Sequence, residues 1–267
     1  VAEVLLGRLW SGWRTAPLRW VRDLALRTAD RVVVISPGMA AKVASRGVDP
    51  ARIKTIENWV DDATIRPIAA AANPLRASWG LAGKLVVGYS GNLGRAHDWQ
   101  TMLEAATLLR DRSDIRFLLI GGGHGQRAFA SAAAQRSLMN VELRPYQPRE
   151  LLALSLAVPD IHWLSLLPGL EGLIFPSKLY GILAVGRPSL LISDPESEVA
   201  TALDRAASGL TVLPGAAGAA ADAILRLADD PQRLRAMGES ARAHLDASLS
   251  RHAALDQWGV VLRTDSK

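Results

Sequence analysis

Residues 171–188 read EGLIFPSKLYGILAVGRP, and the features of this stretch set the expectations for the remainder of the chain. A proline followed by Ser177 is typical of a helix start, and the closing Gly-Arg-Pro is typical of a helix end. Lys178 then lies in the first turn, where the helix dipole disfavours a cation by roughly 0.3–1 kcal/mol. Free amides, the Ser177 hydroxyl and this lysine would together bind a phosphate. The alternative is an ordinary helix of about two and a half turns whose lysine is solvated.

Short apolar runs alternate with helical patterns on both sides of this stretch. The expected strands are residues 85–89, 115–120, 141–144, 161–166, 189–192 and 210–213. The expected helices, besides the one after Pro176, are residues 99–110, 126–135, 149–155, 196–206 and 217–228. Such regular alternation predicts an α/β fold in which helices cover both faces of a parallel sheet. Ligands then bind at the C-terminal ends of the strands.

The loops at these strand ends carry glycine, basic and polar residues. Gly91 and Asn92 begin a turn whose amides could face a diphosphate, and Arg95 and His97 could add charge or hydrogen bonds. The alternative is a tight turn with exposed polar residues. Further loops carry the glycines 121–123, the pair Tyr146 and Gln147, and the segment before Pro176. Four loops from four strands therefore converge on one edge of the sheet.

Several classes of enzyme lack their signatures in this chain. The glycine cluster GGGHGQ does not have the spacing G-x-G-x-x-G, which disfavours a dinucleotide-dependent dehydrogenase. No G-x-S-x-G elbow, P-loop or kinase signature occurs. The histidines are scattered without a carboxylate cluster at ligand spacing, so we expect no metal site. His162 lies within a buried strand pattern, and we expect a core residue there rather than a catalyst.

Composition narrows the partners and the compartment. The chain has 267 residues, a formal net charge of +5 and no cysteine. The absence of cysteine excludes disulfides and fits a reducing compartment, for which the cytosol is the default. The positive charge favours anionic partners, which include nucleotides, lipid head groups and nucleic acid. No run of eighteen apolar residues occurs and the first residues lack a signal-peptide pattern, so we expect no transmembrane helix.

The first 29 residues form a predicted helix with tryptophans and arginines on its surface. Apolar positions recur at Leu6, Trp10, Trp13, Trp20 and Leu24, and the basic residues around them are Arg8, Arg14, Arg19, Arg22 and Arg27. This pattern suits an anionic membrane surface, where each basic residue contributes about 1 kcal/mol. The alternative is a packing face for another domain. Both interpretations remain open at this point.

The segments outside the main alternation complete the predicted outline. Residues 30–36 and 53–56 are expected strands, residues 37–46 are an expected helix, and residues 65–73 are an expected linker. Residues 231–262 are expected to be helical, with Trp258 on the apolar face.

Four segments resemble the family 4 retaining glycosyltransferases of the GT-B fold, in the bacterial branch that builds exopolysaccharide and O-antigen chains. They are VVVISPGM at 32–39, IENWVDDATIRPI at 56–68, GYSGNLGRAHDWQTMLEAA at 88–106, and the stretch at 171–188. The resemblance implies transfer of a sugar, with retention, from a nucleotide-diphosphate donor to a lipid-linked saccharide. It also implies a peripheral cytoplasmic protein on the inner face of the plasma membrane, with no metal cofactor and no nucleic-acid partner.

The resemblance also divides the chain and assigns its residues. Residues 1–68 would be the end of an N-terminal acceptor domain plus a hinge, residues 69–230 a Rossmann-like donor-binding domain, and residues 231–267 helices that pack back toward the N-terminal part. The implied catalytic residues are Lys178, Arg95 and Glu171. The implied nucleotide-sugar-binding residues are Gly91, Asn92, Arg95, His97, Gly121, Tyr146, Gln147, Ser177, Lys178 and Tyr180.

Two positions depart from the family pattern, and they leave a second hypothesis open. His97 stands where the family often has a lysine, and Gly181 stands where a glutamate holds the ribose, while Glu171 is displaced in its loop. The acceptor domain would be represented only by its last helix and strand. The alternative function is therefore a catalytically inert module that binds a nucleotide sugar. A sugar-nucleotide epimerase lacks support, because the sequence shows no catalytic carboxylate and histidine set.

Overall fold

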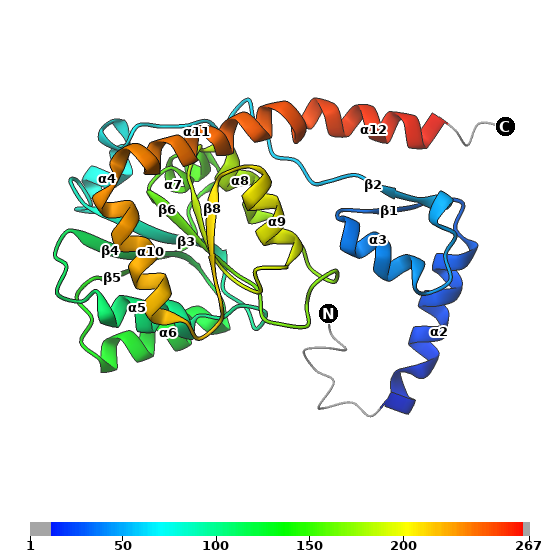
Figure 1. The fold of residues 1–267 in the computed structure, drawn as a ribbon, viewed down its shortest axis with the longest axis horizontal. Coiled ribbons are helices and arrows are strands. Elements are labelled where there is room, and N and C mark those ends of the chain that lie inside the picture. Colours follow the sequence, from blue (N-terminus) through cyan, green and yellow to red (C-terminus); the bar gives the residue numbers. More distant parts are fainter. Residues whose placement is uncertain (1–11, 264–267) are drawn as a thin grey trace.

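The computed structural model describes residues 12–263, with side chains from residue 16 onward (Figure 1). Its first described helix is α2 (Gly12–Thr28), which confirms the helical prediction over that range. Leu6, Arg8 and Trp10 of the predicted surface stripe lie outside the described residues, and the side chains of Trp13 and Arg14 lie outside them too.

The main sheet has six parallel strands in the spatial order β5-β4-β3-β6-β7-β8. The strands are β3 (Leu85–Asn92), β4 (Ile115–Gly122), β5 (Val141–Arg144), β6 (Ile161–Ser165), β7 (Ser189–Ile192) and β8 (Gly209–Val212). This arrangement confirms the predicted parallel α/β sheet. The chain moves outward from β3 to β5 and then returns to β6 on the other side of β3. The topological switch point therefore lies between β3 and β6, where open α/β sheets bind their ligands.

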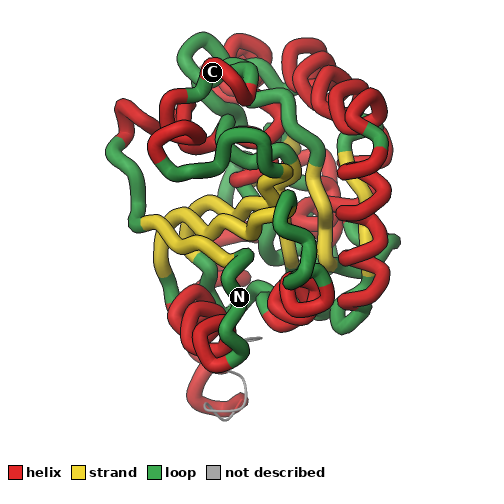
Figure 2. Tube along the Cα trace, turned by 90° about the vertical axis from the view of Figure 1, so that its left-hand side faces the viewer, coloured by secondary structure: helices red, strands yellow, loops and turns green. Residues whose placement is uncertain are grey.

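Helices cover both faces of this sheet (Figures 1 and 2). One face packs against α5 (Gln100–Leu108), α6 (His124–Gln135) and α10 (Ala217–Asp229), with Met102, Phe129 and Ile224 in the shared core. The other face packs against α8 (Lys178–Ala184) and α9 (Glu198–Arg205), and α11 (Pro231–Ser248) adds Leu245 to that core. The short helices α4 (Pro74–Ser78) and α7 (Leu152–Leu156) flank this second face. Three 3-10 turns lie at 50–52, 70–72 and 149–151.

The N-terminal part has a small sheet of its own. Strands β1 (Val32–Val34) and β2 (Ile53–Thr55) pair in parallel, and α3 (Pro37–Ala44) lies between them in sequence. A small core of Val32, Val34 and Val48 supports this unit. The expected strand 30–36 is therefore shorter than predicted, because Ser36 leaves the strand to cap α3 by accepting from the Met39 amide.

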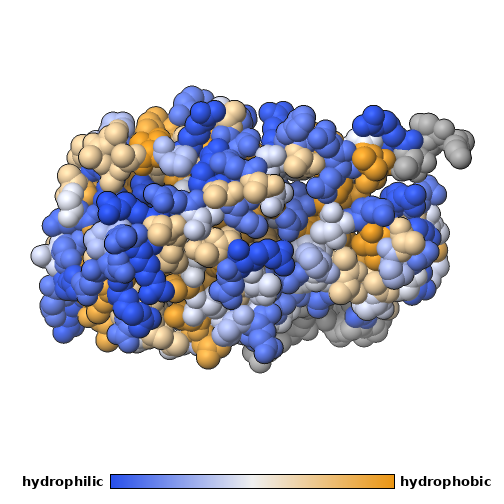
Figure 3. All heavy atoms as spheres, turned by 45° about the horizontal axis from the view of Figure 1, so that its top comes forward, coloured by the Kyte–Doolittle hydropathy of each residue, from blue (hydrophilic) through white to orange (hydrophobic). Residues whose placement is uncertain are grey.

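The tail, which was expected to be helical over 231–262, consists of two helices. Helix α11 ends at Ser248, and α12 (Arg251–Arg263) begins after Ser250, whose hydroxyl accepts from the Ala253 amide at 3.2 Å. This capping bond stabilises a new helix start and explains the break. The solvent-facing side of α11 is mostly hydrophilic (Figure 3).

Helix α11 lies alongside the connection from β2 to α4 (Figure 1). The guanidinium of Arg242 donates to the carbonyl oxygens of Ile65 at 3.1 Å and Ala184 at 2.9 Å. Ala184 is the last residue of α8, so one side chain ties the tail, the connection and the end of α8 together. These bonds hold the C-terminal end of α8 against α11 and the connection.

Candidate functional site

A cavity of about 360 Å³ opens at the switch point, at the C-terminal ends of β3, β4 and β6. Six of the ten predicted nucleotide-sugar-binding residues line it, namely Gly91, Tyr146, Gln147, Ser177, Lys178 and Tyr180. Its remaining wall is mainly apolar and comes from β4, α7, β6, α8 and the segment after β2. An apolar pocket with a few convergent polar groups is the usual form of a small-molecule site.

Lys178 occupies the mouth of the cavity in an unusual environment. Its Nζ donates to the Tyr89 hydroxyl and, at 3.3 Å, to the Asn92 carbonyl oxygen. The same atom lies 3.8 Å from the centroid of the Tyr89 ring, near the hydroxyl end of that ring. Burial lowers the pKa of Lys178 to about 7. An anion beside Nζ would raise this pKa again, because it favours the charged form.

The glycines of this edge make room for the lysine. Gly91 has φ +116°, and a Cβ built there would lie 3.0 Å from the Lys178 Cε. A Cβ on Gly121 would lie 2.4 Å from the Gly91 carbonyl oxygen. Gly121 therefore permits the close approach of β3 and β4 and does not line the cavity. The strands consequently extend further than predicted, to Asn92 and Gly122, and Gly91 still pairs with Gly121.

His97 lies beside this cluster and is neutral at physiological pH. Burial, and secondarily the charge of Lys178, lower its pKa to about 4. Its Nδ1 lies 2.7 Å from the Ser165 carbonyl oxygen. A carbonyl oxygen only accepts, so Nδ1 carries the proton and Nε2 is left as an acceptor. His97 can thus offer a hydrogen bond to a hydroxyl group, but it brings no positive charge to a diphosphate.

Five predicted site residues do not line the cavity, namely His97 and Gly121, already described, and Arg95, Asn92 and Glu171. Arg95 is exposed in the loop after β3 and has no hydrogen bond or ion pair with another described residue. The Asn92 side chain lies against Gly123, so the carbonyl of Asn92 rather than its amide faces Lys178. Glu171 accepts from the Gly169 amide at 2.8 Å within its own loop. The catalytic roles of Arg95 and Glu171 stay predictions.

The start of α8 differs in one respect from the prediction. Ser177 has helical backbone angles, φ −59° and ψ −19°, and its hydroxyl makes no capping hydrogen bond. The predicted cap is wrong, because a capping side chain normally requires an extended backbone at that position. The exposed hydroxyl remains available to a ligand at the cavity.

Gly181 lines the interior of the cavity next to Leu156. A Cβ at this position would lie 3.3 Å from Leu156 Cδ1, so Leu156 limits the room for a longer side chain. His162 also lines the cavity, but its Nε2 bonds the Leu156 carbonyl oxygen at 2.9 Å and burial lowers its pKa to about 4. The interpretation of His162 as a satisfied core residue is supported. Burial also raises the pKa of Tyr180, whose side chain is 2 % exposed.

Reasoning from the sequence placed Ser90 only as part of a strand end at the ligand-binding edge, and it missed Tyr89. Tyr89 contacts Lys178, and the buried hydroxyl of Ser90 faces no hydrogen-bond partner among the described residues, although Ser90 lines the cavity. Both lie within β3, and in the sequence they are indistinguishable from other members of a buried strand. The signal that could have found them is the loop that follows β3, because its residues indicate that the strand ends at a ligand-binding edge of the sheet.

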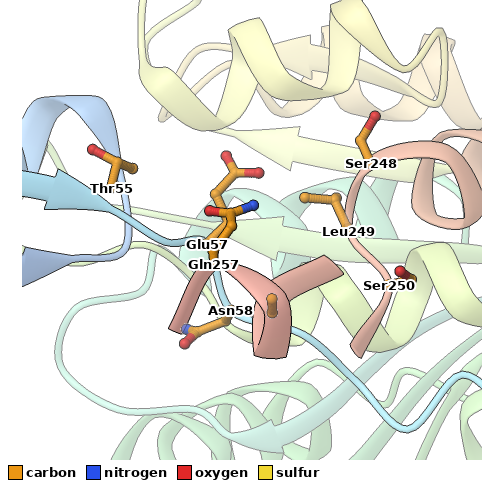
Figure 4. A pocket seen from close by; sticks show the side chains of 8 residues that line it. Thr55, Glu57, Asn58, Ser248, Leu249, Ser250 and Gln257 are labelled. Carbon is orange, nitrogen blue, oxygen red and sulfur yellow. The ribbon is translucent and has the colours of Figure 1, made fainter. Parts of the chain in front are cut away.

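A second cavity, of about 220 Å³, lies between the segment after β2 and the junction of α11 and α12 (Figure 4). Thr55, Glu57 and Asn58 face it from one side, and Ser248, Ser250 and Gln257 face it from the other. It shares no lining residue with the first cavity.

Across residues 12–263, no group of three histidine, cysteine or acidic side chains is arranged to hold a metal ion. No helix within the same range is both long and apolar enough to cross a membrane.

Family models match most of the chain. The model described as "Glycosyl transferases group 1" matches residues 73–244, which include the main sheet and the cavity wall around α8. The chain belongs to the group 1 glycosyltransferases. A model described as "Glycosyl transferase 4-like domain" matches residues 3–59 of this glycosyltransferase. The family-level part of the resemblance is thereby confirmed.

Two curated relatives are similar in sequence to this chain. WcaI of Escherichia coli K12, whose name describes a glycosyl transferase of colanic acid biosynthesis, is 32% identical over 176 residues. That match covers 65% of this chain and 43% of WcaI. WbjE of Pseudomonas aeruginosa, named as a glycosyltransferase, is 25% identical over 246 residues, which are 92% of this chain and 61% of WbjE. This chain therefore matches about half the length of these relatives.

Solved structures share the fold of this glycosyltransferase. HepE of Anabaena, in complex with UDP and glucose, has a TM-score of 0.80 at 17% identity, covering 98% of this chain and 70% of HepE. Sucrose-phosphate synthase of Thermosynechococcus elongatus has a TM-score of 0.78 at 21% identity, covering 99% of this chain and 66% of that enzyme. These likenesses confirm the GT-B type of fold.

Proposed function

We propose that this chain binds the nucleotide-diphosphate sugar donor of a retaining glycosyltransferase that acts on a lipid-linked saccharide in bacterial surface polysaccharide synthesis. The observation that carries the proposal is the cavity at the switch point, where Gly91 near the end of β3, Tyr146 after β5 and Lys178 at the start of α8 meet. The names of WcaI and of the UDP-bound HepE support a sugar nucleotide and an exopolysaccharide product.

The parts of the cavity fit the parts of such a donor. Lys178 would face the diphosphate, with a free N–H to donate, and Arg95 would reach it from the exposed loop after β3. Tyr146 is 60 % exposed at the rim, so its ring is available to stack on a base, with Gln147 beside it. His97 Nε2 would accept from a sugar hydroxyl.

Departure of the diphosphate would be assisted by positive charge without a metal ion. A cation held in place before the reaction stabilises charge that develops on the leaving group. In this proposal Lys178 and Arg95 supply that charge, and Glu171 remains the carboxylate nearest in sequence to the start of α8. The enzyme would be a hexosyltransferase, and its position would be peripheral on the inner face of the plasma membrane.

The exposed face of α2 supports the membrane part of the proposal. Leu18, Trp20, Val21 and Leu24 are exposed by 67 %, 66 %, 56 % and 44 %. Apolar side chains beside basic ones are typical of a helix that rests on an anionic surface. The alternative for this face is packing against another part of an acceptor domain.

A second candidate function is an inert nucleotide-sugar-binding module. Gly181 favours it, because this chain has no carboxylate at the position that holds the ribose in the family. Both functions require donor binding, but only the enzyme releases nucleoside diphosphate from the donor in the presence of an acceptor.

Donor binding is tested by a thermal-shift panel of UDP, GDP, ADP and dTDP with the full 267-residue chain. At least one nucleotide should raise the melting temperature. Lys178→Ala should then weaken its affinity about ten- to a hundredfold, since hydrogen bonds to charged groups contribute roughly 1.5–3 kcal/mol. Lys54→Ala is the matched control, because Lys54 is an exposed lysine of β2 that does not line the cavity. A panel without any shift would refute the proposal.

A further inference from the structure

Tyr89 has two kinds of contact, and only one of them belongs to the core. Its ring packs at 5.2 Å from Trp163 and at 5.7 Å from His97, measured between ring centroids. Its hydroxyl reaches past this packing to the strand end, where it donates to the Asn92 carbonyl oxygen at 2.9 Å. The same hydroxyl accepts from Lys178 Nζ. The side chain is 2 % exposed, so a ligand in the cavity would meet the lysine rather than the tyrosine.

These contacts fix the direction of the Lys178 side chain. The stem lies over Gly91, where the absence of a Cβ lets Cε come close to the backbone. At the end of the stem, the Tyr89 hydroxyl and the Asn92 carbonyl oxygen accept two of the three N–H bonds of the ammonium group. Nζ lies 3.8 Å from the centroid of the Tyr89 ring, beside its hydroxyl end. The third N–H bond of the ammonium group donates to neither of these two acceptors.

We propose that Tyr89 is a positioning residue, which holds the Lys178 ammonium group in one place so that its remaining N–H bond faces the diphosphate of the donor. The inference rests on the proposed function, because it concerns the same site. A lysine stem has four rotatable bonds and a strongly hydrated head, so an unsupported lysine would sample many positions. The hydroxyl of Tyr89 limits that freedom, and less entropy is then lost when the donor binds.

The contrasting interpretation is that Tyr89 only fills the core. Tyr89→Phe separates the two, because the ring and its packing remain while the hydroxyl is removed. The Asn92 carbonyl oxygen loses one donor but lies at an exposed residue, where water can replace it. A purely structural role therefore predicts a small change in stability and no effect that depends on Lys178.

The test is a double-mutant cycle of Tyr89→Phe and Lys178→Met, in the full chain, by calorimetry with whichever of UDP, GDP, ADP and dTDP gives the largest thermal shift. We expect Tyr89→Phe alone to weaken binding about three- to tenfold, the usual loss for one hydrogen bond. The same substitution should have no effect on affinity in the Lys178→Met background. The matching nucleoside, which lacks phosphates, should bind both single variants as it binds the wild type.

The outcomes separate the two proposals. If Lys178→Met leaves nucleoside diphosphate affinity unchanged, the proposed function fails. If Lys178→Met weakens binding but Tyr89→Phe does not, or if Tyr89→Phe has an equal effect in both backgrounds, the positioning role alone is overturned. Thermal unfolding of each variant shows whether it is folded. Should Tyr89→Phe unfold, a crystal structure of the wild-type chain with the bound nucleoside diphosphate decides: a Lys178 Nζ that has left the Tyr89 hydroxyl in the complex overturns the inference.

Discussion

Binding of a nucleoside diphosphate should weaken as pH rises above 7, and Lys178 is the reason. Burial lowers the pKa of this lysine to about 7 in the empty protein, and an anion beside it raises that pKa in the complex. The favourable interaction is therefore fully present below the empty-state pKa. It is lost as pH climbs from there toward the pKa of the complex.

The size of the effect follows from the protonated fraction. With a pKa of about 7, roughly half of the lysines carry a proton at pH 7 and roughly one in a hundred at pH 9. If only the ammonium form binds the diphosphate, the affinity for the nucleoside diphosphate falls about fiftyfold between pH 7 and pH 9. His97 contributes nothing in this window, because its pKa of about 4 leaves it neutral throughout.

Calorimetry at pH 7, 8 and 9 measures the affinity, and repeating the titration at pH 8 in two buffers of different ionisation enthalpy measures proton uptake. We expect close to one proton per nucleotide at pH 8. Lys178→Met should show neither the pH dependence nor the uptake. An affinity that is flat from pH 7 to 9, or a wild-type profile that persists in Lys178→Met, would refute the reasoning.

Three further predictions concern the strand edge, the fold and the membrane. Gly91→Ala should weaken nucleotide binding at least tenfold in calorimetry and lower the free energy of unfolding by about 1–2 kcal/mol, because φ is +116° and the new Cβ meets the lysine stem. Asp160→Asn should lower the free energy of unfolding in urea by about 3–5 kcal/mol, since it leaves buried Arg76, now 2.8 Å from the Asp160 carboxylate, without its counter-charge. The protein should sediment with anionic vesicles more than with neutral ones, and less at high salt; equal pelleting with both would make the exposed α2 face a packing surface.

The sequence predicted the sheet well because its central strands carry runs of buried, mostly apolar residues. The bounds 141–144 and 189–192 match β5 and β7 residue for residue, since turns with polar residues or prolines flank both strands. The predicted ends of strands were wrong where pairing with a neighbouring strand decides how far a strand extends. The strand after Leu85 continues to Asn92 because Gly91 and Gly121 approach too closely for side chains, which a single-strand pattern does not reveal.

The site was predicted at the level of loops and less well at the level of side chains. Lys178 was predicted as a phosphate-binding residue because the helix dipole disfavours a cation in the first turn of a helix. The structure places this lysine in the wall of the cavity. Its partner Tyr89 was not found, because the pairing joins residues 89 apart in sequence and depends on how β3 and α8 meet. The protonation state of His97 likewise depends on burial and on the Ser165 carbonyl, neither of which a sequence shows.

The most direct test of the account is a crystal structure of this chain with the nucleoside diphosphate that gives the largest thermal shift. We predict that the phosphates lie in the 360 Å³ cavity, with an oxygen within hydrogen-bond distance of Lys178 Nζ and the base against Tyr146. The Tyr89 hydroxyl should still contact Nζ. A diphosphate bound elsewhere, such as in the cavity between Glu57 and Gln257, or a Lys178 that does not reach it, would contradict the account.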